Sequence, residues 1–555
     1  MPHIRVGPVA VRIGPTYASD MSAQPGRPVT GPADPELDPT ASYALDPRRV
    51  HQLLGRVHSS SDDIRQTYAP FTGQPLAQVP QSTTSDVASA AAIARATQST
   101  WAATDLDRRA EVLLNLHDLV LDRQHEILDL IQWESGKARK HAFEEVAHVA
   151  MTARYYARTA RRHLTSRSRL GLYPLLTRVQ VNRVPKGVVG IISPWNYPFT
   201  MALSDGLPAL LAGNTIVHKP DSQTVLSALL GMELLEAAGM PPDAWQIVSG
   251  PGPVIGPAMI DNVDFVCFTG STRTGRTVAT RAAERLIGCS LELGGKNPML
   301  VLRDASVSRA AEGAVRACFS SAGQLCVSME RMFVADEIYD RFVAAFVDRV
   351  ESMRMAADFS YETDLGSLIS QDQLDRVTAH IDDAVAKGAK VLTGGRARPD
   401  IGPLFYEPTV LDRVQPSMTC FGHETFGPVV SIYRFTAEAD AIERANQGSY
   451  GLNAAIYSRD VSRARSIARR IRCGSVNINE AYGATFGSID SPMGGMRESG
   501  LGRRQGSEGI HRYTEPQAVA AQRLVRYAPM LGMSDETYVR LQTQALRLMK
   551  KARRP

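Results

Sequence analysis

The stretch "VDFVCFTGSTRTGRTVATRAAERL", residues 263–286, decides the fold class of this 555-residue chain. An apolar run ends at Thr269, Gly270 follows, and a helical pattern begins directly afterwards. A short apolar run bounded by glycine is typical of a buried strand, and a strand that leads through a tight turn into a helix is half of a βαβ unit. The stretch therefore predicts a mostly parallel sheet covered by helices.

The same alternation continues on both sides of this stretch. Residues 85–163 show apolar residues at helical spacing, opened by a Ser-Asp cap at residues 85–86, and strands are expected at 188–192, 214–220 and 244–250. A second α/β run begins near Pro298 and continues to about residue 480. We predict two α/β lobes with a junction at "ELGGKNP", residues 292–298, and we find no internal repeat.

Composition indicates a globular protein of the reducing cytoplasm. Hydrophobic residues make up 44% of the chain and charged residues 21%, and no run approaches the 18 apolar residues of a membrane span. The six cysteines form no CxxC pair and show no metal-ligand spacing, so neither disulfides nor a metal site is expected. Residues 1–40 lack a signal-peptide pattern and are rich in Pro and Gly, which favours a disordered arm.

Positive charge is concentrated at the C-terminus. The whole chain has a net charge of +5, and residues 521–555 alone carry +6. The other 520 residues therefore sum to −1, which does not indicate nucleic-acid binding. Within this tail Ser534 is expected to cap a helix whose apolar stripe contains Leu541 and Leu548. Three readings of the tail stay open: packing on the body or on a neighbouring subunit, weak contact with a membrane or shielding of an aldehyde tunnel, and disorder.

Four short motifs carry the candidate chemistry. Cys326 in "SSAGQLCVSMER" (320–331) is either a buried apolar thiol or a nucleophile, because the neighbouring Gly323 and Gln324 are not core residues. Glu292 in "ELGGKNP" is either a loop carboxylate or a general base. "FTGSTRTG" (268–275) is an ordinary turn or a phosphate-binding helix start, and "SPWNYP" (193–198) places Asn196 where an amide can stabilise an oxyanion.

Taken together, these motifs resemble those of the aldehyde dehydrogenase superfamily. "PWNYP", "FTGSTRTG", "ELGGKNP", "GQLC" and "ETFGPVV" occur in the family's order, and the 34-residue step from Glu292 to Cys326 matches its spacing of base and nucleophile. The resemblance covers about residues 45–520. It implies a Rossmann-type cofactor domain, an α/β catalytic domain and a small β element for oligomerisation.

The resemblance also implies a mechanism. The cysteine that matches Cys326 attacks the aldehyde carbon, the amide that matches Asn196 and the cysteine's own N–H hold the oxyanion, and hydride transfer leaves a thioester. The carboxylate that matches Glu292 activates water to hydrolyse this thioester, so an acylating, CoA-dependent reaction is disfavoured. A catalytically silent binding protein on the same scaffold is the alternative, although it predicts loss of these residues. The matching cofactor contacts fall into four groups: Trp195 and Asn196 on the cofactor side of their turn; Lys219, Pro220, Asp221 and Ser222 at the adenosine ribose; Gly270 and Ser271 at the pyrophosphate; and Leu293, Glu424 and Phe426 at the nicotinamide and its ribose.

Cofactor choice is indicated by "HKPDSQT", residues 218–224. Many NAD-preferring members of the family carry Glu at the position of Ser222, where it binds the ribose 2′-hydroxyl. The absence of that carboxylate removes repulsion toward a 2′-phosphate, while Lys219 can pair with it. NADP is therefore the expected cofactor, with some use of NAD.

Longer stretches resemble the second type of actinobacterial succinate-semialdehyde dehydrogenase (NADP). They include "KGVVGIISPWNYP", "GSLIS", "ARPDIGPLFYEPTVL" and "SPMGGM". Better-known members of that group hold the distal carboxylate with two arginines, and the matching positions here are Ser204 and Ser320. Longer or less polar aldehydes are therefore the alternative substrates, and Arg316, Arg331 and Arg497 are candidates to replace the missing arginines.

The resemblance divides the chain as follows. We expect a disordered arm (1–40), a dinucleotide-binding domain (41–168 and 187–293), a catalytic domain (294–487), an oligomerisation element (169–186 and 488–520) and a basic amphipathic tail (521–555). A homodimer or homotetramer is the expected assembly.

Overall fold

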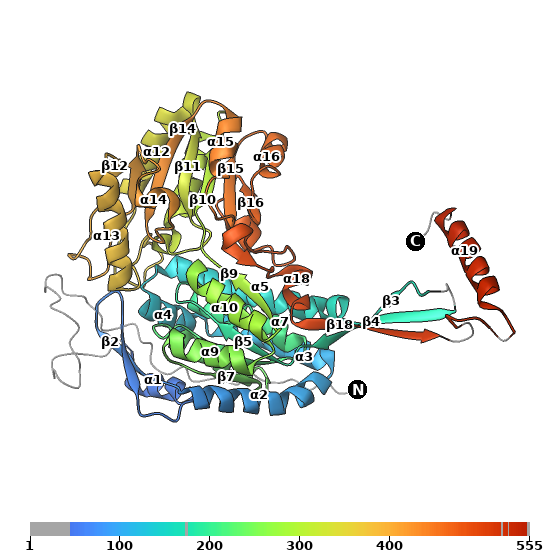
Figure 1. The fold of residues 1–555 in the computed structure, drawn as a ribbon. Coiled ribbons are helices and arrows are strands. Elements are labelled where there is room, and N and C mark those ends of the chain that lie inside the picture. The colour runs from blue at the N-terminus through green and yellow to red at the C-terminus, as the bar shows by residue number, and fades with distance from the viewer. Residues whose placement is uncertain (1–44, 173–175, 523–525, 531, 552–555) are drawn as a thin grey trace, which may run out of the picture.

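The computed structural model describes residues 45–172, 176–522, 526–530 and 532–551. Two α/β lobes lie against each other, and a narrow arm projects from the first lobe (Figure 1). The predicted α/β fold class with two lobes is confirmed. The disorder predicted for residues 1–40 lies outside the described residues.

The first lobe contains a six-stranded sheet in the order β17-β9-β8-β5-β6-β7. The four pairings among β9, β8, β5, β6 and β7 are parallel, and β17 pairs with β9 in the antiparallel sense. Its strands are β5 (Val188–Ile192), β6 (Thr215–Lys219), β7 (Trp245–Ile247), β8 (Phe265–Thr269), β9 (Gly288–Glu292) and β17 (Gly500–Leu501).

Both faces of this sheet are buried, which explains the continuous apolar runs in its strands. Val189 and Cys267 pack toward one group of helices, whereas their neighbours Val188, Val266 and Phe268 pack toward the other. This alternation is what a doubly wound sheet requires. The first group is α1 (Pro47–Leu54), α3 (Leu106–Asp122), α4 (Gln124–Ser135), α5 (Arg139–Leu164), α6 (Pro198–Leu203), α7 (Gly206–Leu211) and α8 (Val225–Ala237). The second group is α2 (Thr84–Ala103), α9 (Gly252–Asn262) and α10 (Thr272–Glu284).

The second lobe contains a seven-stranded sheet in the order β12-β13-β14-β11-β10-β15-β16, with its own apolar core. Only β12 is antiparallel to its neighbour. Its strands are β10 (Asn297–Val301), β11 (Met329–Ala335), β12 (Lys390–Thr393), β13 (Thr409–Asp412), β14 (Val429–Phe435), β15 (Asn453–Tyr457) and β16 (Ser475–Ile478). Its helices are α11 (Val307–Phe319), α12 (Tyr339–Glu351), α13 (Gln371–Ala386), α14 (Thr419–Gly422), α15 (Glu438–Ala445), α16 (Val461–Ala468) and α17 (Gly483–Phe486).

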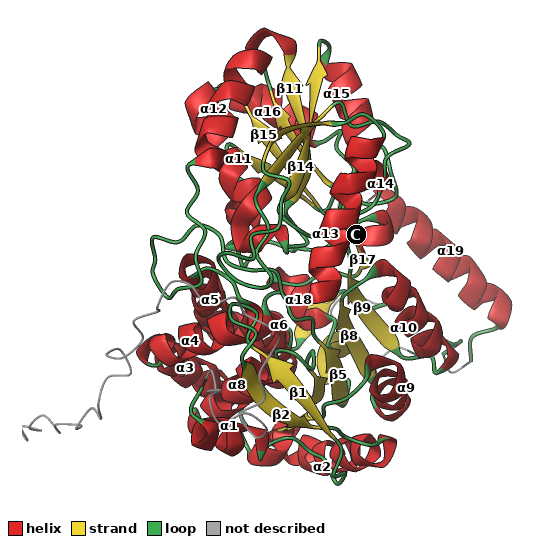
Figure 2. Cartoon of the chain, turned by 90° about the vertical axis from the view of Figure 1, so that its left-hand side faces the viewer, coloured by secondary structure: helices red, strands yellow, loops and turns green. Residues whose placement is uncertain are grey.

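The chain passes from one sheet to the other at the predicted junction. β9 ends at Glu292, and β10 begins at Asn297 in the second sheet. The carboxyl ends of the first sheet's strands therefore lie beside the segments that enter the second sheet, as the two views show (Figures 1 and 2). Ligands of open α/β sheets bind at such carboxyl ends.

The arm is built on a three-stranded antiparallel sheet in the order β18-β4-β3. Its strands are β3 (Arg167–Arg169), β4 (Thr177–Pro185) and β18 (Thr514–Gln522), and helix α19 (Asp535–Lys551) follows it. A separate hairpin, β1 (Ile64–Tyr68) and β2 (Pro75–Pro80), lies on the first lobe. In Figure 1 the arm and α19 extend away from both lobes.

Two local findings refine the sequence predictions. The cap of α2 is Thr83 and not Ser85, because the Thr83 hydroxyl accepts a hydrogen bond from the N–H of Asp86 while the Asp86 carboxylate accepts one from the N–H of Thr83. Ser534 caps α19 as predicted, since its hydroxyl accepts a hydrogen bond from the Thr537 N–H at 3.3 Å. Among the described residues, every helix is too short or too polar to cross a membrane.

Candidate active site

Cys326 lies on a loop whose backbone is held in an unusual conformation. Just before it, Ser321 and Ala322 have φ angles of 51° and 55°, in the left-handed region that residues with side chains seldom adopt. Gly323 follows with φ of 68°, and a Cβ atom there would lie 2.0 Å from the carbonyl oxygen of Gly427. Such strain persists only where the surroundings hold it, and it clusters at functional sites.

Side-chain amides fix this loop on both sides of the thiol. Gln324 accepts a hydrogen bond from the N–H of Ile369 at 3.0 Å. Asn297, the first residue of β10, donates to the carbonyls of Cys326 and Ser328, each at 2.7 Å. Cys326 forms no disulfide and the residue as a whole is half-buried, so the loop defines the position of a free thiol.

Asn196 lies beside the same loop. It follows β5, is buried, and donates from Nδ2 to the carbonyl of Gln324 at 3.0 Å. Gln324 precedes Cys326 by two residues, which brings the amide close to the thiol. An amide nitrogen carries two hydrogens, so the second can donate to an oxyanion that forms on a carbon attached to Cys326.

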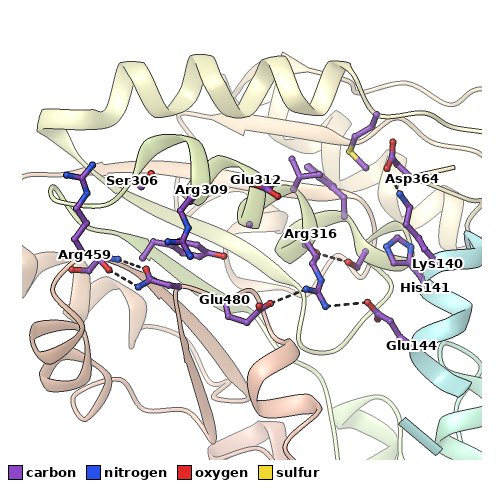
Figure 3. Close-up of a pocket in the computed structure, with 18 of the residues that line it drawn as sticks. Lys140, His141, Glu144, Ser306, Arg309, Glu312, Arg316, Asp364, Arg459 and Glu480 are labelled. Atoms are coloured by element: carbon purple, nitrogen blue, oxygen red, sulfur yellow. Dashed lines mark hydrogen bonds and ion pairs between the residues drawn. The ribbon is translucent and has the colours of Figure 1, made fainter. Parts of the chain in front are cut away.

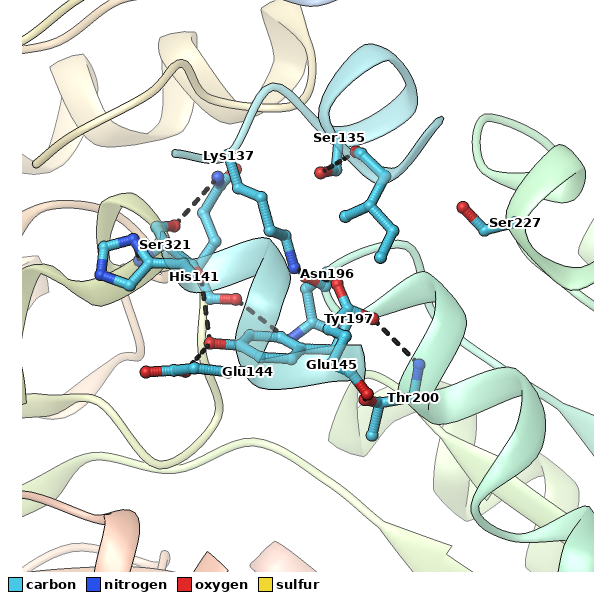
Figure 4. Close-up of polar contacts among 12 residues, drawn as sticks. Ser135, Lys137, His141, Glu144, Glu145, Asn196, Tyr197, Thr200, Ser227 and Ser321 are labelled. Carbon is cyan, nitrogen blue, oxygen red and sulfur yellow. Dashed lines mark hydrogen bonds and ion pairs between the residues drawn. The ribbon is translucent and has the colours of Figure 1, made fainter. Parts of the chain in front are cut away.

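A buried ion pair anchors the turn that carries Asn196. The Nζ atom of Lys137 donates to the Asn196 carbonyl at 2.6 Å and to Glu145 at 2.5 Å, and it lies 3.8 Å above the ring of Tyr197. Glu145 in turn accepts from the N–H of Thr200 at 2.9 Å (Figure 4). Removal of one partner from such a pair leaves an uncompensated buried charge, which is strongly destabilising. The turn that carries Asn196 therefore depends on both Lys137 and Glu145.

Glu292 occupies the end of β9, the point at which the chain leaves the first sheet. It is held between its strand neighbours Thr269 and Gly500. Its carboxylate is buried, and burial raises its pKa to about 7 although nearby Arg504 opposes the change. A general base works best when its pKa lies near the working pH.

The thiol of Cys326 requires such a base. Burial raises its pKa to about 12; the charge of Glu292 adds to this effect, and Arg504 counteracts it. In the chain by itself the thiol is therefore protonated at neutral pH, and a thiolate forms only when another group takes the proton.

The residues expected at the pyrophosphate lie at the start of α10. β8 ends at Thr269, Gly270 forms the turn, and Ser271 caps the helix by accepting a hydrogen bond from Thr274. The first turn of a helix offers free N–H groups and the positive end of the helix dipole. The N–H of Gly270 also donates to the Glu292 carbonyl at 3.0 Å, which joins this turn to the base.

The residues expected at the adenosine ribose follow β6. Within the described part of the chain, the buried side chain of Lys219 makes one hydrogen bond, to the Pro220 carbonyl at 3.1 Å, so donors remain for a ligand. The Ser222 side chain is buried, and the Asp221 carboxylate caps its own turn by accepting from the N–H of Gln223. A buried cation with unused donors fits a phosphate group such as the 2′-phosphate of NADP.

The residues expected at the nicotinamide come from both lobes. The rings of Trp195 and Phe426 meet edge to face, 5.4 Å apart. Glu424 accepts from the N–H of Gly295 at 2.8 Å, and burial raises its pKa to about 8. The Leu293 side chain packs on Gly275 of α10, so any contact of Leu293 with a cofactor comes from its backbone.

Two further arginines near these residues were not predicted from the sequence. The positive charge of Arg65 on β1 contributes to lowering the pKa of Lys219. Gln223 connects β1 to the turn after Lys219 by donating a hydrogen bond to the Tyr68 carbonyl at 2.8 Å. Arg504 lies beside Glu292 and Cys326 and influences the pKa of both. Neither arginine belongs to a motif, so only the tertiary structure reveals them.

A cavity of about 760 Å³ lies beside the nucleophile loop, between α5 and the second lobe (Figure 3). Ser320, on the nucleophile loop, is among its lining residues. Charges of both signs line it. The cations are Lys140, Arg309, Arg316 and Arg459, and the anions are Glu144, Glu312, Asp364 and Glu480.

Of the three arginines proposed to replace the missing pair, only Arg316 lines this cavity. Its guanidinium lies 3.4 Å from Glu480 and 3.8 Å from Glu144 and stacks over Tyr482. Arg331 donates to the backbone carbonyls of residues 296, 444 and 445, and Arg497 to those of residues 446 and 450. Both therefore serve the backbone of the second lobe.

Comparison with known proteins gives a consistent result. Residues 57–519 match the profile of the aldehyde dehydrogenase family. A "putative succinate-semialdehyde dehydrogenase (NADP+)" of Mycolicibacterium smegmatis is 48% identical over 511 residues, which cover 92% of this chain and 99% of that protein. A protein with the same description, numbered 2, from Mycobacterium tuberculosis is 50% identical over 463 residues, 83% of this chain and 89% of that protein.

Solved structures resemble the chain over nearly their whole length. An NADP-dependent enzyme of E. coli superposes with a TM-score of 0.81 at 33% identity, covering 84% of this chain and 96% of that one. A betaine aldehyde dehydrogenase of Staphylococcus aureus in complex with NAD+ also gives 0.81, at 30% identity, with coverage of 86% and 95%.

Proposed function

The chain belongs to the aldehyde dehydrogenase family, and from that premise we propose that it converts succinate semialdehyde to the dicarboxylic acid with NADP+ as the preferred oxidant. The names of its relatives and the buried, partly unsatisfied Lys219 support this proposal. The observation that carries the chemistry is the meeting of Cys326, Asn196 and Glu292 at the junction of the two sheets.

In the first half of the proposed reaction Cys326 is the nucleophile. A base, for which Glu292 is suited by its pKa of about 7, takes the thiol proton, and the sulfur bonds to the aldehyde carbon. The carbonyl oxygen then carries negative charge, which the free N–H of Asn196 stabilises. Bound NADP+ would supply the hydride acceptor, so that loss of hydride from this carbon would leave a thioester on Cys326. The residues at the ends of β6, β8 and β9 would hold the cofactor.

In the second half Glu292 activates water. Glu292 first loses the thiol proton to solvent. The water oxygen then bonds to the thioester carbon while Glu292 takes the water proton, and the carbon–sulfur bond breaks to release the acid and the thiolate of Cys326, which regains a proton. A carboxylate with a pKa near neutrality is suited to this repeated exchange of protons.

A second candidate substrate class is an aldehyde that is longer or less polar. Ser204 and Ser320 cannot form the charged pair that a distal carboxylate prefers, and the Ser204 hydroxyl is bound to His148 at 3.0 Å. Arg316 is the cation best placed to substitute, yet Glu144 and Glu480 already contact it. A substrate with a distal carboxylate would therefore need Arg316 as its partner, whereas an uncharged aldehyde would not.

A substrate panel tests the proposal. We expect kcat/KM for succinate semialdehyde to exceed that for butanal, an uncharged aldehyde of equal chain length, by at least about tenfold, the value of one charge-assisted hydrogen bond. Octanal and benzaldehyde complete the panel, and Cys326→Ala is the control that must lose oxidation of every aldehyde. A preference for octanal would favour the second candidate, and activity in Cys326→Ala would refute the mechanism.

We further propose that a second copy of the chain covers the arm. Large apolar side chains are exposed on its strands and on α19, including Leu170, Val519, Leu546 and Leu548, at 48–68% of their full exposure. Exposed apolar groups in such density usually mark an interface. A homodimer or homotetramer follows from this proposal, and contact of α19 with a membrane is the competing one. A cytoplasmic location stays a prediction from cysteine usage.

A further inference from the structure

A buried cluster of one acid and two guanidiniums lies next to the candidate base. Asp205 precedes α7 and accepts from Arg504 at 2.6 Å through one oxygen and from Arg512 at 2.6 Å through the other. The three side chains, here named the Asp205 cluster, are each exposed by 10% or less. They come from α7 and from the two ends of α18 (Gly506–His511), and they carry a net charge of +1.

Both guanidiniums lie along the face of the sheet on which Glu292 projects. Arg504 donates to the Thr269 hydroxyl at 3.1 Å, and Thr269 is the direct neighbour of Glu292 across β8 and β9. Arg512 donates at 2.7 Å to the hydroxyl of Ser290, two residues before Glu292 on the same strand. Residues two apart on a strand share a face, so the cluster runs beside the base.

Unsatisfied polar atoms on the two sides complement each other. Among the described residues, Oε1 of Glu292 and Nε of Arg504 are buried and make no hydrogen bond. A carboxylate oxygen only accepts and a guanidinium N–H only donates, so a contact between them, direct or through one water, would satisfy both groups. Arg504 itself is fixed by Asp205 and Thr269, so it forms the stationary half of this pair.

We propose that Arg504, held in place by Asp205, is a positioning residue that keeps Glu292 ionised and oriented for the hydrolysis of the thioester. The inference rests on the proposed function and extends it to a residue outside the recognised motifs. Arg504 touches neither substrate nor cofactor in this role, so its loss acts through the pKa of Glu292 and, more weakly, through that of Cys326.

The charges around Glu292 determine the sign of the effect. Burial raises the pKa of Glu292, Arg504 provides the largest opposition, and Asp205 adds to the increase. Loss of the Arg504 charge therefore raises the pKa further and leaves more of the base protonated at pH 7. The charged and titratable groups that face Glu292 are Arg503, Arg504, Arg512, Asp205 and Cys326.

A purely structural role makes different predictions. Asp205 connects α7 to both ends of α18, so a substitution in the cluster also loosens the packing of the first lobe. Loosening lowers the unfolding temperature and all steps of turnover together. Loss of base function slows hydrolysis, in which Glu292 takes a proton while water attacks. Deprotonation of the thiol is an equilibrium that precedes attack on the aldehyde, so the first half of the reaction still goes to completion and the thioester accumulates.

The experiment compares Arg504→Gln, Arg504→Lys and the control Arg281→Gln, which removes the same charge from the surface of α10, where Arg281 pairs with Asp261. At saturating aldehyde and NADP+, we expect Arg504→Gln to move the acid limb of the kcat profile up by about one pH unit. At pH 7 this lowers kcat about fivefold, because the ionised fraction of a base whose pKa rises by one unit from about 7 falls from about one half to about one tenth. The pre-steady-state burst of NADPH should remain, and the acyl-enzyme should accumulate in acid-quenched samples measured by intact mass spectrometry. Arg504→Lys and Arg281→Gln should keep the acid limb within about 0.3 units of the wild type.

The outcomes separate the possible failures. An unchanged acid limb in Arg504→Gln, or no acyl-enzyme despite a slow kcat, would overturn the role of Arg504. If Arg504→Gln does not fold, Arg504→Lys decides the question, because an acid limb displaced despite the retained charge contradicts the proposal. Absence of any NADPH from the wild type with every aldehyde would instead refute the proposed function.

Discussion

Arg65 and Lys219 bring two cations to one corner of the first lobe. Lys219 is buried and has donors to spare, whereas Arg65 is exposed on β1 and forms no ion pair within the described part of the chain. The buried Ser222 nearby adds no charge that would repel a phosphate. A 2′-phosphate carries about two negative charges and can accept from both cations, which the 2′-hydroxyl of NAD cannot.

This arrangement predicts that Arg65 contributes to cofactor choice. We expect Arg65→Gln to weaken NADP+ binding about five- to twentyfold, the loss of one charge-assisted contact, and to leave NAD+ binding unchanged. Isothermal titration of the enzyme with each cofactor measures this directly, without turnover. Arg48→Gln, an exposed arginine on α1, is the control. Equal loss of affinity for the two cofactors would contradict the prediction.

At the residue scale, the sequence predicted what short motifs encode. Asn196, Glu292 and Cys326 each lie in a stretch of fixed order and spacing, and Ser204 and Ser320 could be recognised as departures because they are counted from those residues. Their roles stay predictions until they are measured. Arg65 and Arg504 had no such reference point, because the residue with which each interacts, Lys219 or Asp205, lies more than 100 positions away in the chain.

At the scale of elements, the nucleophile loop is held by close backbone packing. Gly323 has no space for a side chain, since a Cβ would meet the Gly427 carbonyl oxygen at 2.0 Å. Gly388, after α13, has a similar left-handed backbone with φ of 96° but open space around it. The two glycines thus separate the cost of the backbone conformation from the cost of the clash.

Substitution of these glycines tests the loop. We expect Gly388→Ala to destabilise the fold by about 1 kcal/mol through backbone strain and to retain activity. Gly323→Ala should cost about 2–4 kcal/mol, because the segment before β14 must move, and should displace Cys326 enough to lower kcat by at least about tenfold. Thermal unfolding and steady-state kinetics measure both effects. Equal losses of stability in the two variants would contradict the role of the clash.

Elements were predictable where periodicity is strong. The apolar run at 188–192 had to be buried on both faces, and it became the central strand β5. The start of α2 was misplaced by two residues, because Thr83 and Asp86 bond to each other in three dimensions and Ser85 lies between them. Several neighbouring polar residues here could cap the helix, and residue type alone does not determine which of them forms the capping hydrogen bonds.

At the scale of the whole molecule, the arm and α19 are the part that the chain leaves uncovered. The predicted tail helix exists, but its apolar residues, such as Leu546 and Leu548, are exposed at 64% and 68%. Packing on its own body therefore does not account for them. The proposed second copy does, and it also covers the strand edges of the arm.

Removal of the tail tests this assembly. We expect the full chain to form a dimer or tetramer by light scattering coupled to size exclusion, and a chain ending at Gln522 to assemble less tightly, with its dissociation constant raised at least about tenfold. Co-sedimentation with anionic and neutral vesicles provides the second readout. Unchanged assembly together with loss of vesicle binding in the shortened chain would assign α19 to the membrane.

The separation between the reaction centre and the cavity wall has an evolutionary consequence. The candidate base and cofactor turns lie at strand ends of the first sheet, whereas the cavity is lined by outward-facing residues of α5, α11 and the loops after β15 and β16. Mutations can therefore remodel the wall without moving the strand ends. Descendants of one ancestral enzyme could exchange one aldehyde for another by drift in a few helix-surface codons, while selection continued to preserve the inherited chemistry.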